Sequence, residues 1–413
     1  MSPRRANPWL ALVNDTIRWR DFVDYRRSFE VARAGEDVLD RLTAELDSRG
    51  AAVADEIGPA AKRLMLRLQQ IQLHADDSSG AIGGACQAAL DLYARCCREG
   101  SPDAVKLARW IVTAREDSPG WPNITLEPFA PALTEPAWTA YRTAVAELDA
   151  RTEPGPYGTD RFEVERMLLE LLDHDGDVDG AIRLLSERKA PRFGAIIERL
   201  LAVGRTDEAM DWLDRAVAAG RIWHQDDDYH LAYGTAADLY ARAGRVQDGI
   251  DILRDGFRRH AGAGSYRALV DYAANHGRDD AERDWALAEA TRQAGLTDGH
   301  ALVDIHLADG DEEAAWAAAR DYGAGAWWSE LATRFRTEHP DRAGELYAMQ
   351  LPGLLAEADT RDYPRIARHL VEMELLYAAA GRTDEFRSLL AELRTTYARR
   401  PSFIKALDKH GLP

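Results

Sequence analysis

Residues 233–256 read YGTAADLYARAGRVQDGIDILRDG, and they hold two helical patterns separated by a glycine turn. Gly244 ends the first pattern, Arg245 to Asp248 supply a polar turn with an acidic residue, and the small residue Gly249 follows in the second pattern. Glycine adopts the left-handed conformation that terminates a helix, and an acidic residue is favoured at the positive N-terminus of the next helix. The stretch therefore predicts two antiparallel helices that approach closely at a small residue.

The same turn recurs along the C-terminal part of the chain. Counting Gly244, it begins at Gly176, Gly204, Gly244, Gly277, Gly310 and Gly381, and successive glycines lie 28, 40, 33, 33 and 71 residues apart. The last interval is about two periods, and Pro340 to Ala343 marks the expected place of the missing turn. A period of this length predicts an array of helix-pair repeats.

The N-terminal part is also predicted to be helical. Apolar residues recur at helical spacing in 36–46, 57–73 and 82–97, and we find no alternating run that would indicate a sheet. Residues 151–159 hold two prolines and two glycines, which is typical of a domain boundary. We therefore expect a helical domain at 1–150 and a repeat array at 151–413.

The repeat array resembles degenerate tetratricopeptide repeats, whose unit is a helix pair of about 34 residues. The best unit is the stretch quoted above, in which large, small and aromatic residues match the family pattern at Tyr233, Ala237, Tyr240, Gly249, Leu253 and Gly256. The resemblance implies an all-α fold, with antiparallel helix-pair repeats forming a tetratricopeptide-like superhelix beside an N-terminal helical bundle. It also implies a role in binding proteins or peptides.

A second resemblance covers roughly residues 20–412. The stretches that carry it are Asp21–Arg33, Asp76–Gly84, Ala89–Thr113 and Ser402–Leu412, and they look like an uncharacterised all-helical region that commonly follows a SWIM-type zinc finger in bacterial proteins. The finger needs a Cys-x-Cys pair and a distant Cys-x-His, which this sequence lacks. Zinc binding is therefore not expected, and a separately encoded finger-bearing protein is suggested as a partner.

Composition excludes several classes of function. The chain has 413 residues and a formal net charge of −18, which should repel nucleic-acid phosphates. No run of about 18 apolar residues occurs, so no membrane span is expected. Three cysteines, Cys86, Cys96 and Cys97, make no disulfide framework and favour a reducing cytoplasm. Phosphate-binding, metalloprotease and nucleophile-elbow motifs are missing, so we expect no cofactor and favour a protein that is not an enzyme.

An acidic column is predicted from the repeat register. Six residues before the motif glycines stand Glu170, Glu198, Asp238, Asp271, Asp304 and Leu375, so five of the six are acidic. On the first helix of tetratricopeptide-like pairs this column would line a concave face and attract a basic peptide, with Arg242 setting the local register. Two simpler interpretations stay open, namely a solvated face and salt bridges to arginines on adjacent helices.

The alternative function is that of an enzyme or a metal-dependent protein. Residues 223–230 read WHQDDDYH, so that two imidazoles flank three carboxylates, and His224, Asp226 and His230 are the candidate ligands of a divalent transition metal. The same acids immediately precede a strong helical segment, and capping of that helix is the simpler explanation for them.

Overall fold

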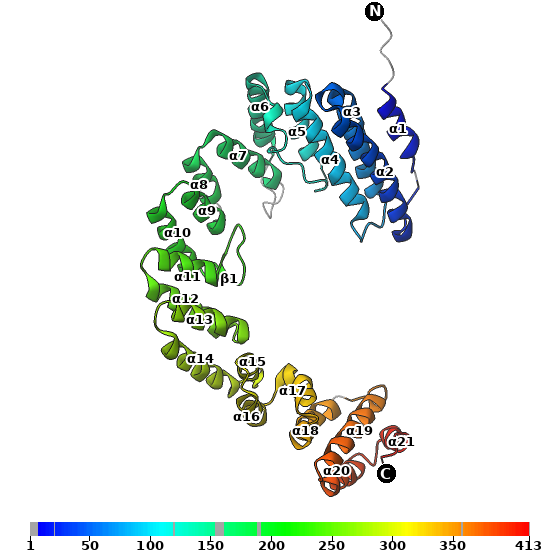
Figure 1. Ribbon diagram of the computed structural model, residues 1–413, viewed down its shortest axis with the longest axis vertical. Helices are drawn as coiled ribbons and strands as arrows, with labels where there is room; N and C mark the ends of the chain where they lie inside the picture. Colours follow the sequence, from blue (N-terminus) through cyan, green and yellow to red (C-terminus); the bar gives the residue numbers. More distant parts are fainter. Residues whose placement is uncertain are drawn as a thin grey trace, which may run out of the picture. The chain divides into compact units, whose positions relative to one another are not determined.

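The computed structural model is all-α, which confirms the predicted fold class (Figure 1). It describes residues 7–19, 21–118, 120–152, 161–187, 191–356 and 358–412. The chain divides into two compact units, Met1–Arg188 and Lys189–Pro413. The expected boundary between residues 150 and 151 stays a prediction, since most of the proline- and glycine-rich connector lies outside the described residues.

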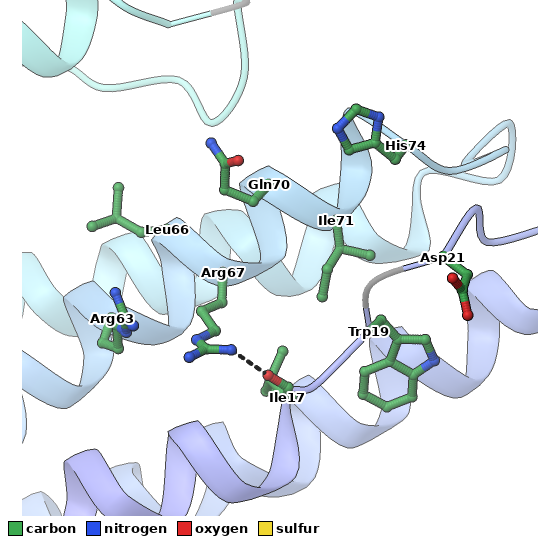
Figure 2. Close-up of a pocket in the computed structure, with 9 residues that line it drawn as sticks. All are labelled: Ile17, Trp19, Asp21, Arg63, Leu66, Arg67, Gln70, Ile71 and His74. Carbon is green, nitrogen blue, oxygen red and sulfur yellow. Dashed lines mark hydrogen bonds between the residues drawn. The ribbon is translucent and has the colours of Figure 1, made fainter.

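The first unit is built around three long helices. Its described elements are α1 (Pro8–Thr16), α2 (Tyr25–Arg49), α3 (Ala51–Gln72), α4 (Ala81–Glu99), α5 (Ala104–Glu116), the 3-10 turn η1 (Ala130–Ala132), α6 (Glu135–Arg151), α7 (Phe162–Asp175) and α8 (Val178–Ser186). Helix α3 packs against α4, and α2 lies against both. The short helix α1 and the segment after it lie across α3, beside a cavity that Figure 2 shows.

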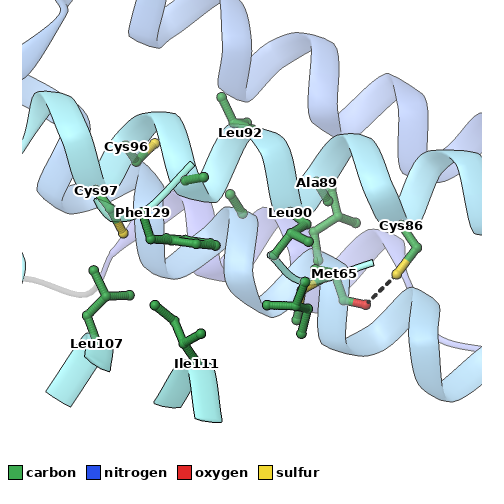
Figure 3. Packing of buried hydrophobic residues seen from close by; sticks show 14 of the residues in the cluster. Met65, Cys86, Ala89, Leu90, Leu92, Cys96, Cys97, Leu107, Ile111 and Phe129 are labelled. Carbon is green, nitrogen blue, oxygen red and sulfur yellow. Dashed lines mark hydrogen bonds between the residues drawn. The ribbon is translucent and has the colours of Figure 1, made fainter. Parts of the chain in front are cut away.

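The core of the first unit uses the apolar positions expected from helical spacing. Leu42, Leu46, Ile57 and Leu64 are fully buried, as the periodicity predicts. The cysteines lie in the same core, Cys96 and Cys97 near Phe129 and Cys86 beside Met65, and none of the three forms a disulfide (Figure 3). Burial raises the pKa of the Cys86 thiol to about 12, which keeps the group protonated and unreactive.

The second unit is a succession of helix pairs. Its helices are α9 (Phe193–Ala202), α10 (Thr206–Ala218), α11 (Tyr233–Arg242), α12 (Val246–Arg259), α13 (Ala263–Ala274), α14 (Asp279–Ala294), α15 (His300–Ala308), α16 (Glu312–Tyr322), η3 (Gly325–Trp327), α17 (Trp328–Phe335), α18 (Pro340–Ala356), α19 (Tyr363–Ala379), α20 (Thr383–Thr396) and α21 (Pro401–Lys409). Each odd-numbered helix from α9 to α19 packs against the next one, and α21 packs on α19. A two-residue parallel bridge joins β1 (Ile222–Trp223) and β2 (Leu231–Ala232).

Five of the six glycine turns form the corners of these pairs, and the turn at Gly176 joins α7 to α8 in the first unit. All six motif glycines have φ between 69° and 75°, the left-handed region that suits a helix C-terminus. After Gly244, the Arg245 N–H donates to the Tyr240 carbonyl at 2.8 Å, a bond that closes the end of α11. Helix α18 begins at Pro340, where the missing turn is predicted.

Close helix approach explains Gly249, which stands where the repeat family usually has alanine. A Cβ atom at this position would lie 2.0 Å from the Tyr272 hydroxyl oxygen. That hydroxyl passes α12 and donates to the Ala237 carbonyl at 3.1 Å, which ties α13 to α11. The glycine therefore opens space for a contact between the first helices of two successive pairs.

Candidate partner-binding surface

Glu170, the first member of the predicted acidic column, lies on α7 and belongs to the interior of the first unit. Its carboxylate pairs with Arg115, whose side chain is only 1% exposed, and it accepts a hydrogen bond from the Tyr141 hydroxyl at 3.5 Å. Arg115 Nε also donates to Glu163 at 3.1 Å. At Glu170 the structure thus matches the interpretation in which the acid pairs with an arginine of a neighbouring helix.

In the second unit, ion pairs connect the second helix of one pair to the second helix of the next. Such bridges join α10 to α12, α12 to α14, α16 to α18 and α18 to α20, at 2.7 to 2.8 Å, through Asp214–Arg245, Glu282–Arg254, Glu313–Arg342 and Glu345–Arg382. The four acids of these bridges, Asp214, Glu282, Glu313 and Glu345, are therefore already engaged with arginines of the same protein.

Three acids of the first helices behave differently. Glu198 on α9, Asp238 on α11 and Asp271 on α13 are exposed, and none has a hydrogen bond or ion pair to another residue that the structure describes. Each directly follows a buried apolar residue of the same helix. These three carboxylates are available to an external group. The position of the column on a concave face stays a prediction.

Asp304, on α15, has a local role. Its Oδ2 accepts a hydrogen bond from the Ala263 N–H at 2.7 Å and so caps the start of α13. Asp271 lies eight residues further along α13, about 12 Å at 1.5 Å per residue. Arg242 is exposed at the end of α11 without a partner among the described residues, and its role in setting register stays a prediction.

Asp238 and Asp271 border one joint between α11 and α13. The Tyr272 hydroxyl that bonds the Ala237 carbonyl connects the immediate chain neighbours of the two acids. Burial raises the pKa of Tyr272, and the negative charges of Asp238 and Asp248 raise it further. The negative charge of Asp238 therefore acts on Tyr272, the residue that directly follows Asp271.

A cavity of about 320 Å³ involves the same two helices and lies between the starts of α11 and α13 and the end of α12. Small residues, rings and one leucine line it, namely His224, Ala232, Tyr233, Gly234, Leu253, Gly256, His260, Gly264, Ser265 and Ala268. Gly234 and Asp238 are four residues apart on α11, and Gly264 and Asp271 are seven apart on α13, so each pair shares a helix face. We call this cavity with Asp238 and Asp271 the α11–α13 groove.

Trp223 lies next to two rings of the cavity wall. Trp223 is 42% exposed, and its ring lies 5.0 Å from the His224 ring and 5.6 Å from the His260 ring. Half-exposed rings beside a small-residue cavity offer apolar contact area to a partner side chain.

Two of the three candidate metal ligands, Asp226 and His230, are engaged in local hydrogen bonds, and the third, His224, lines the cavity described above. Asp226 accepts hydrogen bonds from the Ala232 N–H and the Thr235 hydroxyl, each at 2.7 Å, and so caps α11. Asp227 accepts from the backbone N–H of His230 at 2.8 Å and lies 3.0 Å from its ring Nδ1. Within the described ranges, no group of three or more His, Cys, Asp or Glu side chains is arranged to hold a metal ion.

Sequence reasoning missed the cavity and the arginine bridges. The cavity needs glycines from three different helices, and no periodic pattern connects them. Two of the four bridges had a visible signal, because Arg245 and Arg382 directly follow motif glycines, whereas Arg254 and Arg342 do not.

Comparisons with known proteins add little to this description. No family model and no curated protein matches the chain. One solved structure, described as "Circular tandem repeat protein with novel repeat topology and enhanced subunit contact surfaces", is 11% identical over 97% of this chain and 81% of its own, with a TM-score of 0.16. A similarity at that score does not establish a shared fold, so the helical-repeat fold rests on the helix pairs of this chain. The resemblance to the region that follows SWIM-type fingers stays a prediction.

Proposed function

We propose that the protein is an interaction scaffold whose second unit binds a basic segment of a partner protein at the α11–α13 groove. The observation that carries this proposal is that Asp238 and Asp271 are exposed and unpaired with any described residue. They lie about one and two helical turns from Gly234 and Gly264, which line the cavity between α11, α12 and α13. Helical repeats commonly present such surfaces to extended partners.

The groove supports a partner motif of defined spacing. At a rise of 1.5 Å per residue, Asp238 lies about 6 Å along α11 from Gly234. Asp271 lies about 10 Å along α13 from Gly264. An extended peptide advances about 3.3 Å per residue. A partner with an apolar side chain in the cavity would therefore place a lysine or arginine two or three residues away.

The proposal includes a compartment and a partner class. Three cysteines that are buried and free of disulfides support a reducing cytoplasm. No described helix has both the length and the apolar character that a membrane crossing requires. The net charge of −18 favours a basic protein partner over nucleic acid. A separately encoded protein with a SWIM-type finger is the partner that the sequence resemblance suggests.

Fluorescence anisotropy with short labelled peptides tests the proposal. A peptide that contains Leu-Ser-Arg should bind the full chain and weaken at high salt, whereas its Leu-Ser-Glu counterpart should not bind. The double variant Asp238→Lys/Asp271→Lys should abolish binding.

The matched control is Asp284→Lys/Glu392→Lys, which changes net charge by the same amount at exposed acids that have no partner among the described residues. It should leave affinity nearly unchanged, and circular dichroism should show both variants folded. Equal losses in the two double variants, or no loss in either, would refute the proposed groove.

A further inference from the structure

We propose that the groove between α1 and α3 in the first unit binds a small amphiphilic anion, that is, an apolar or aromatic body that carries a carboxylate or a phosphate (Figure 2). This site is independent of the α11–α13 groove and lies in the other unit.

The cavity has the size and the mixed lining that such a ligand needs. Its volume is about 360 Å³, within the range of small-molecule sites. The apolar part of the lining comes from Ile17, Trp19, Leu66 and Ile71, and the polar part from Arg63, Arg67, Gln70, His74 and Asp21. An apolar body can rest on the first group while hydrogen-bond donors of the second group bind the charged end.

The donors follow one face of α3. Arg63, Arg67 and Gln70 are spaced four and three residues apart, which places them in a row along the helix, and His74 lies just beyond the end of α3. Two guanidinium groups and an amide along one wall create a positive, donor-rich strip. Such a strip favours an oxyanion over a neutral or cationic ligand.

Asn14 holds this strip in place. Its Oδ1 accepts hydrogen bonds from Arg63 Nε at 3.2 Å and from Arg67 Nη2 at 3.0 Å, and Arg67 Nη1 donates to the Ile17 carbonyl at 2.9 Å. Within the described part of the chain, the two terminal nitrogens of Arg63 have no hydrogen-bond partner. A guanidinium anchored through Nε with both terminal nitrogens free is suited to bidentate contact with a carboxylate or a phosphate.

The one carboxylate of the lining lies away from this anchor. Figure 2 shows Asp21 at the end of the groove beside Trp19, while Arg67 and Ile71 lie between it and Arg63. The anionic end of the ligand therefore belongs at Arg63, and its apolar body extends along Ile71 towards Trp19. This orientation keeps the bound anion far from Asp21.

Isothermal titration of the full chain tests the inference with three probes of one shape. 2-Naphthoate and 2-naphthyl phosphate carry the two candidate anions, and 2-naphthamide is the neutral control. We expect at least one anionic probe to bind at least about tenfold more tightly than the amide, because a charge-assisted hydrogen bond is lost in the amide. The stronger of the two anions identifies the charged group.

Arg63→Gln should weaken the preferred anion at least about tenfold and leave the amide unchanged. The control Arg41→Gln removes another exposed arginine of the first unit, on α2, and should change nothing. If Arg63→Gln does not fold, Gln70→Glu serves instead, because a carboxylate on the donor strip repels the anion from an exposed position. Equal affinity for amide and anions, or an unchanged affinity in the folded Arg63 or Gln70 variant, overturns the inference.

Discussion

Replacement of Glu170 by glutamine should destabilise the first unit, because Arg115 would lose one of its two carboxylate partners. Arg115 is almost completely buried, with its side chain 1% exposed, and Glu170 is 23% exposed. Removing one partner of a buried ion pair costs about 3–5 kcal/mol. Since Glu163 remains bound to Arg115 at 3.1 Å, we expect a loss of about 2 kcal/mol in the free energy of unfolding.

Hydrogen exchange followed by mass spectrometry measures this loss where it occurs. Peptides from α5, α6 and α7 should exchange faster in Glu170→Gln than in the wild type, while peptides of the second unit should keep their rates. Glu198→Gln is the matched control, since Glu198 is exposed and has no partner among the described residues. That control should change the free energy of unfolding by less than about 0.5 kcal/mol.

A second substitution separates charge from packing. Arg115→Met combined with Glu170→Gln removes the buried charge together with its partner, and it should recover part of the stability lost in the single variant. The reasoning is wrong if Glu170→Gln exchanges at wild-type rates, or if it weakens peptide binding at the α11–α13 groove without changing the stability of the first unit.

Three further predictions concern the second unit. Gly249→Ala should lower the free energy of unfolding by about 2–3 kcal/mol in urea titrations, because the new Cβ collides with the Tyr272 hydroxyl. Adding Tyr272→Phe should recover part of the lost stability. Gly234→Leu should abolish binding of the Leu-Ser-Arg peptide in anisotropy measurements, because the new side chain starts at the lining of the cavity. The helix should stay stable, because a Cβ at Gly234 meets open space. Unaltered binding would contradict the assignment of the cavity. Burial lowers the pKa of His369 below its ordinary 6.5, so the unfolded chain binds more protons, and stability that is complete above about pH 6.5 should fall as the pH drops below it. Urea midpoints measured across this range should depend less on pH in His369→Gln, and an identical pH dependence in the variant would refute this.

The fold could be predicted because its signals are local. A glycine turn needs only the residues around it, so Gly176 to Gly381 and the helix start at Pro340 can be read from short stretches. The buried faces of the long helices follow from spacing alone, as Leu42 and Leu64 show.

The site could be predicted only in part. The repeat register predicts where a residue lies on its helix, but it does not predict which side chains of other helices lie next to that residue. Glu170 and Asp238 share a register position, yet Arg115 reaches Glu170 from 55 residues away, and no arginine of the described chain pairs with Asp238. Asp304 is drawn into a cap by a backbone N–H 41 residues earlier. The cavity depends on glycines of α11, α12 and α13 that meet only after the pairs stack.

The arginine bridges decide how repeats of this kind can be exchanged. Arg245 binds Asp214 of the preceding pair and Asp248 of its own helix, and Arg382 does the same with Glu345 and Glu385. If the α11–α12 pair or the α19–α20 pair were duplicated or grafted, it would thus have to keep its turn arginine and find a receiving acid on the pair before it. Such a helix pair and the acid upstream of it should therefore be transferred together. A truncation that removes α10 would leave Arg245 without its Asp214 partner.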